Sequence, residues 1–111
     1  MTTTYIAKVL IQAGEYEKTS RFLVVAESKA LAEDYAVYSE SHGPDSLDWA
    51  QRAVFDLGGE FAYTASVEQV RLDDLCILEK YLPTMTADVS ELLASGNYKQ
   101  HRTTNQKSDS I

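Results

Sequence analysis

The residues that could carry out chemistry are few and widely spaced in this sequence. Among 111 residues there are two histidines, His42 and His101, and a single cysteine, Cys76. Zinc sites and catalytic triads combine several histidine, cysteine or carboxylate side chains at defined spacings, and no HxxxH, HExxH or CxxC pattern occurs here. The sequence therefore predicts no catalytic residues, no metal site and no cofactor.

The cysteine has the wrong neighbours for a reactive thiol. Cys76 lies between Leu75 and Ile77, shortly after Asp73 and Asp74. A nucleophilic thiolate needs nearby positive charge, and carboxylates act in the opposite direction. We therefore expect Cys76 to be a small, buried apolar residue.

Adjacent carboxylates are the other potential source of acid–base chemistry. They occur in three places: Glu33-Asp34, Asp45 with Asp48, and Asp73-Asp74. In an acidic protein such neighbours usually cap helices or face solvent, and only burial would separate their pKa values enough for catalysis. Neither a GxSxG elbow nor a phosphate-binding GK[ST] loop is present. The chain is therefore predicted not to be an enzyme.

The charge of the chain indicates which classes of partner it does not bind. There are 10 Lys and Arg against 17 Asp and Glu, a net charge of −7; residues 96–111 carry +2, so residues 1–95 carry −9. Phosphate backbones are bound by clustered cations, which this acidic body lacks. We expect no direct contact with nucleic acid or an anionic membrane, and a protein partner with a basic surface instead.

Hydropathy and cysteine content favour a cytoplasmic protein without a membrane segment. The longest apolar run, Phe22 to Ala26, is far shorter than the roughly 20 residues needed to cross a bilayer. The first residues show no basic and apolar secretory pattern. One cysteine cannot form an intramolecular disulfide.

Hydrophobic periodicity predicts the elements that position these residues. Alternation predicts strands over 5–12, 21–26 and 60–67, with a loop of about eight residues joining the first two. Ser28 is expected to cap a helix that ends at Gly43-Pro44. Two short helices follow the third strand, one before Pro83 and one before Gly96.

Residues 46–57 allow two interpretations. Leu47, Ala50, Val54 and Leu57 recur at helical spacing, which favours a helix. Alternatively, residues 52–57 form a strand that pairs through Gly58-Gly59 with the next one, because a glycine pair between apolar runs also marks a hairpin.

Together these elements predict an α+β domain, residues 1–95, followed by a flexible, slightly basic tail, residues 96–111. Its small antiparallel sheet of about three strands would be covered on one face by helices in the order ββααβαα. Exposed edges of so small a sheet favour pairing with a second copy, and hence a homodimer.

The functional hypothesis is a small, acidic, non-enzymatic protein-binding module that acts on a larger basic partner. A narrower version is a phage- or plasmid-type inhibitor that mimics nucleic acid, provided that the carboxylates cluster. The alternatives are a ligand-binding or enzymatic domain with a pocket between helix and sheet, recognised by a buried carboxylate or His42, and a self-assembling structural subunit. The residues proposed to bind the partner are acidic, with one aromatic anchor: Glu33, Asp34, Glu40, Asp45, Asp48, Trp49, Asp73 and Asp74.

Overall fold

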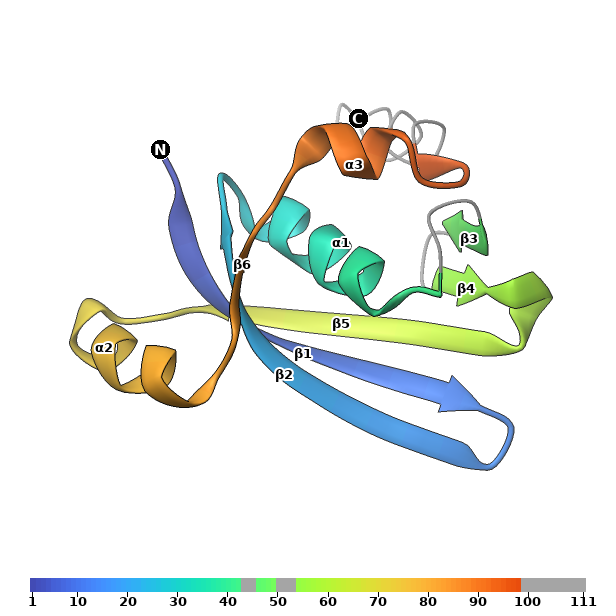
Figure 1. Cartoon of the computed structure of the whole chain (residues 1–111), viewed down its shortest axis with the longest axis horizontal. Helices are drawn as coiled ribbons and strands as arrows, with labels where there is room; N and C mark the ends of the chain where they lie inside the picture. Colours follow the sequence, from blue (N-terminus) through green and yellow to red (C-terminus); the bar gives the residue numbers. More distant parts are fainter. Residues whose placement is uncertain (43–45, 50–53, 99–111) are drawn as a thin grey trace, which may run out of the picture.

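The computed structural model describes residues 1–42, 46–49 and 54–98. A six-stranded mixed sheet in the order β3-β4-β5-β1-β2-β6 forms one layer, and α1 and α3 lie over one of its faces (Figure 1). The elements are β1 (Thr3–Ala13), β2 (Tyr16–Ala26), α1 (Lys29–Glu40), β3 (Leu47–Trp49), β4 (Val54–Asp56), the 3-10 turn η2 (Leu57–Gly59), β5 (Phe61–Gln69), α2 (Leu72–Tyr81), β6 (Thr84–Thr86) and α3 (Val89–Leu93).

The long central strand β1 organises the sheet. It pairs antiparallel with β2 on one side and with β5 on the other. Because side chains alternate along a strand, Tyr5, Ala7, Val9 and Ile11 all face α1 and are buried. The other face, which carries Ile6, Lys8 and Leu10, is only partly covered.

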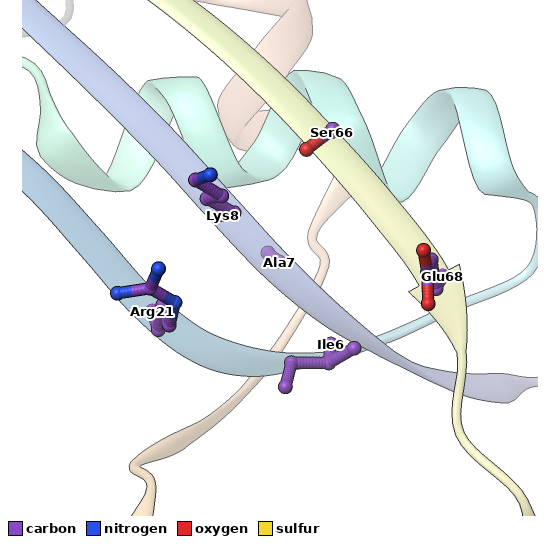
Figure 2. Close-up of a pocket in the computed structure, with 6 residues that line it drawn as sticks. All are labelled: Ile6, Ala7, Lys8, Arg21, Ser66 and Glu68. Carbon is purple, nitrogen blue, oxygen red and sulfur yellow. The ribbon is translucent and has the colours of Figure 1, made fainter.

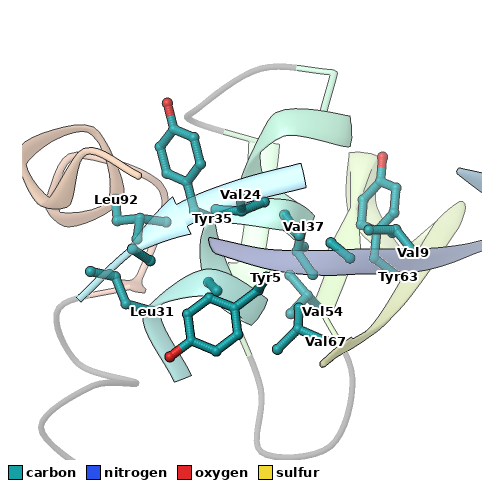
Figure 3. Packing of buried hydrophobic residues seen from close by; sticks show 14 of the residues in the cluster. Tyr5, Val9, Val24, Leu31, Tyr35, Val37, Val54, Tyr63, Val67 and Leu92 are labelled. Carbon is teal, nitrogen blue, oxygen red and sulfur yellow. The ribbon is translucent and has the colours of Figure 1, made fainter. Parts of the chain in front are cut away.

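The core lies between the sheet and α1. Ser28 caps α1 by accepting a hydrogen bond from the Leu31 backbone, as predicted, and the helix buries one apolar side against β1, β2 and β5. Figure 3 shows how these side chains meet, and the cluster continues through α3. Its principal members are Tyr5, Val9, Val24, Leu31, Tyr35, Val37, Val54, Tyr63, Val67 and Leu92.

The predicted fold was wrong in its sheet. The structure has six strands instead of about three, the pairing of β6 with β2 is parallel, and the described order is ββαβββαβα instead of ββααβαα. The helix expected over 46–57 is also wrong: β3 and β4 flank residues 50–53, and β4 pairs with β5 across Gly58-Gly59, as in the alternative interpretation. The short strand β6 was not predicted.

Two boundaries also differ from the prediction. β2 begins at Tyr16, so the turn after β1 contains only Gly14 and Glu15, with Gly14 at a φ of 61°. Tyr98 is 1% exposed and belongs to the core, so ordered structure continues past the expected boundary at residue 95. The rest of the predicted tail, residues 99–111, lies outside the described residues, as does the Gly43-Pro44 helix stop.

The helix α2 stands apart from the rest of the molecule. It projects beyond the end of the sheet (Figure 1) and contains no buried residue. Leu75 and Leu78 are half-buried, whereas Leu72, Ile77 and Tyr81 are exposed. Across the described ranges, no helix is long and apolar enough to cross a membrane.

Candidate functional site

Among the described residues, Asp56 has the largest number of side-chain hydrogen bonds. It ends β4, is fully buried, and accepts five hydrogen bonds. The His42 backbone N–H, the His42 Nδ1 and the Tyr63 hydroxyl lie 2.9, 2.9 and 2.8 Å from its Oδ2. Ser46 Oγ and the Leu57 backbone N–H donate to its Oδ1.

These contacts determine the charge of Asp56. Burial alone would raise its pKa, but the hydrogen bonds from Ser46, His42 and Tyr63 together outweigh burial and lower the pKa to about 2. Burial, with the negative charge of Asp56, raises the pKa of Tyr63. Because an ionised carboxylate only accepts hydrogen bonds, His42 Nδ1 carries a proton and Nε2 is left at the opposite edge of a ring that is 46% exposed.

The arrangement resembles one half of a catalytic triad, in which a carboxylate orients a histidine. A triad also needs a nucleophile hydrogen-bonded to the free histidine nitrogen. Here the nearest hydroxyls, those of Ser46 and Tyr63, both donate to Asp56 instead. The cluster joins the segment after α1 to β4 and η2, and holds Leu57 at a φ of 51°. Its evident role is structural.

A shallow pocket lies on the opposite face of the sheet. Figure 2 shows Lys8 on β1 and Arg21 on β2, with Ser66 and Glu68 on the neighbouring β5. Lys8 is directly opposite Arg21 in the strand register. Like charges in this position repel each other. Within the described part of the chain neither cation makes an ion pair, although the carboxylate of Glu68 lines the same pocket.

The outer side of α2 combines apolar and acidic groups. Ile77 and Tyr81 are four residues apart and therefore adjacent on the helix, and they are 58% and 78% exposed. Asp73 and Asp74 occupy the first turn of the same helix and are exposed. We call Asp73, Asp74, Ile77 and Tyr81 the docking stripe.

The structure does not gather the residues proposed from sequence into one surface. Glu33, Asp34 and Glu40 lie along α1, Asp48 is exposed on β3, Asp73 and Asp74 lie on α2, and Asp45 is outside the described residues. In Figure 1, α1 lies over the sheet and α2 beyond its end. Three of these carboxylates have contacts within the fold: Tyr98 donates to Asp34, Asn97 donates to Asp48, and Arg71 pairs with Asp73 at 3.8 Å on the surface.

The proposed aromatic anchor does not face a partner. Trp49 is 3% exposed, and its Nε1 donates to Ser95 Oγ at 3.2 Å. Its ring packs edge-to-face against the ring of Tyr98, with the two ring centroids 4.8 Å apart. Cys76 shows the reverse error, because it is exposed on α2 instead of buried. Aromatic type alone did not separate Trp49 from Tyr81, whereas the i, i+4 pairing of Ile77 and Tyr81 was a usable signal.

Asp56, Lys8 and Arg21 were also missed by sequence reasoning. Nothing in the local sequence marks Asp56, because its partners come from distant segments. To place Lys8 opposite Arg21, the sequence analysis would have needed the correct hairpin turn, because the turn sets the register of the two strands.

No group of three or more metal-binding side chains occurs in the ranges described. No family model, curated protein or solved structure matches this chain.

Proposed function

We propose that this protein is a non-enzymatic, cytoplasmic protein-binding module that docks through the docking stripe of α2. The observation that supports the proposal is that α2 exposes Ile77 and Tyr81 while burying no residue of its own. A helix whose apolar side chains remain in water contributes little to folding, whereas the same side chains can be buried in the groove of another protein.

The chemistry of the stripe specifies the partner. Its two apolar anchors require a hydrophobic groove, and Asp73 and Asp74 at its N-terminal end require basic residues on the rim of that groove. Complementary rim charge accelerates association and selects against acidic partners, and its effect weakens in high salt. A larger protein with a basic, apolar groove fits both requirements.

Mimicry of nucleic acid has less support than docking by one helix. A mimic needs a continuous acidic face, and the described carboxylates proposed from sequence are divided among α1, β3 and α2. An enzymatic function is also less well supported, because Asp56 is buried and ionised but neither it nor His42 lines the pocket on the open face of the sheet.

The proposal can be tested by affinity capture from lysate with three forms of the full chain. The double variant Ile77→Ser/Tyr81→Ser removes both anchors from the stripe. Leu72→Ser is the matched control. Leu72 is 86% exposed on the same helix, but it lies on the opposite side of the helix axis from Tyr81, because the two residues are about two and a half turns apart. We expect wild type and Leu72→Ser to retain one stoichiometric protein that the double variant loses.

Salt dependence separates the electrostatic part of the proposal from the apolar part. Asp73→Asn/Asp74→Asn should reduce capture at low salt and make the remaining capture less sensitive to salt. Equal capture by all the variants, or loss with Leu72→Ser as readily as with the double variant, would contradict docking through the stripe.

A further inference from the structure

The outer edge of β2 has free hydrogen-bonding groups. The Leu23 N–H donates to Pro83 O at 2.8 Å and Val25 O accepts from the Ala87 N–H at 2.8 Å, so odd-numbered residues of β2 point their backbone groups away from β1. By the alternation of an antiparallel strand, residues 17, 19 and 21 do the same. β6 pairs only with residues 23–25, and no other described strand pairs with that edge.

This free edge is open to another chain. Residues 16–19 and 21 are exposed, and Figure 1 shows the hairpin of β1 and β2 extending past the helices with β2 on its outer side. An accessible strand edge of this length is a template for pairing with a further strand.

We propose that the edge pairs antiparallel with β2 of a second copy, with Thr19 on the two-fold axis. This register aligns Thr19 with the partner subunit's Thr19 and places Glu17 directly opposite the partner's Arg21. Since residues 17, 19 and 21 all point their backbone groups outward, the pairing forms about six backbone hydrogen bonds. A two-fold interface of this kind is self-complementary.

The charges along the edge favour this register. Arg21 lies opposite Lys8 within its own chain, and among the described residues it has no acidic partner. Glu17 lies opposite the neutral Gln12. Pairing in the proposed register gives each Arg21 an acidic neighbour on the same face of the sheet, which offsets the repulsion from Lys8. Two such contacts form, related by the two-fold axis.

Charge reversal tests the register. The wild type should sediment at about twice the monomer mass of 12.4 kDa at high micromolar concentration. Arg21→Glu and Glu17→Arg should each weaken dimerisation at least tenfold, because like charges then face each other. The double variant Glu17→Arg/Arg21→Glu restores opposite charges and should recover the dimer. Failure of the double variant to recover it overturns the register.

A backbone substitution tests the pairing itself. Thr19→Pro removes an outward N–H without removing a hydrogen bond to β1, so the monomer should keep its fold, as shown by unchanged Trp49 fluorescence and circular dichroism. We expect the dimer to be lost. A monomeric wild type, or a dimer that survives Thr19→Pro, overturns the proposal. Variants of α2 should leave the dimer intact, so this outcome is independent of partner docking.

Discussion

Replacing Asp56 with asparagine removes the negative charge on which five hydrogen-bond donors converge. The amide keeps the shape of the side chain but replaces one carboxylate oxygen by an NH2 group, which cannot accept a hydrogen bond. In one orientation the NH2 group faces the donors of His42 and Tyr63, and in the other it faces the hydroxyl of Ser46. Because Asp56 is fully buried, water cannot replace the lost partners.

The size of the effect follows from two estimates. Removing one partner from a buried, charge-assisted cluster costs about 3–5 kcal/mol, so we expect Asp56→Asn to lower the free energy of unfolding at pH 7 by about 3 kcal/mol. A pKa lowered from 3.8 to about 2 corresponds to about 2 kcal/mol of stability that depends on the ionised carboxylate.

The pH dependence has a definite sign. Because the folded-state pKa of Asp56 is below the unfolded-state value, its contribution is complete above about pH 5 and is lost as the pH falls from about 4 towards 2. The stability difference between wild type and Asp56→Asn should therefore shrink by about 2 kcal/mol at pH 2.

Urea unfolding followed by the fluorescence of the buried Trp49 measures both quantities. Asp73→Asn is the matched control, because Asp73 is 86% exposed and its replacement should leave stability nearly unchanged. A difference between wild type and Asp56→Asn that is equal at pH 7 and pH 2 would refute the proposed ionisation of Asp56.

Two further predictions concern the end of the described chain. Gly96→Ala should destabilise the fold by several kcal/mol in chemical denaturation, because an added Cβ would overlap the carbonyl oxygen of Leu47, whereas Gly14→Ala, with open space around it, should cost about 1 kcal/mol. Truncation after Ser95 should lower the midpoint of thermal unfolding by at least several degrees relative to truncation after Tyr98, because it removes the Tyr98 side chain, which is 1% exposed. Equal midpoints would show that Tyr98 contributes nothing to stability.

Periodicity predicted the long elements well. The strands over 5–12 and 60–67 and the helix capped by Ser28 were confirmed because a single buried face dominates each pattern. The helix before Pro83 and the one before Gly96 were also located correctly. In each case local sequence and tertiary burial agree.

The pattern over residues 46–57 predicted the wrong element because a carboxylate occupies an inward position. Leu47, Trp49, Val54 and Asp56 are the buried residues of β3 and β4, so the strands alternate correctly only when Asp56 counts as an inward residue. An aspartate normally marks the solvent side, and the apolar residues alone then match helical spacing. Its burial depends on donors from β5 and from the segment after α1, which local sequence does not reveal.

The remaining differences have similar causes. β6 has three residues, too few to show any period, and it forms only because α2 returns the chain to the edge of β2. Tyr98 is buried by packing against Trp49, which is almost 50 residues away in the sequence. Trp49 was proposed as an interface anchor because, on the expected helix, it lies between the core positions Leu47 and Ala50 and need not be fully buried.

Photo-crosslinking from Cys76 tests docking through α2 most directly. Cys76 is exposed, lies on α2, and is the only cysteine in the sequence, so a thiol-reactive crosslinker attaches beside the docking stripe. Docking through the stripe predicts one major adduct with a different protein in lysate, kept by Leu72→Ser and lost with Ile77→Ser/Tyr81→Ser. No adduct, or an adduct formed equally by both variants, would contradict it.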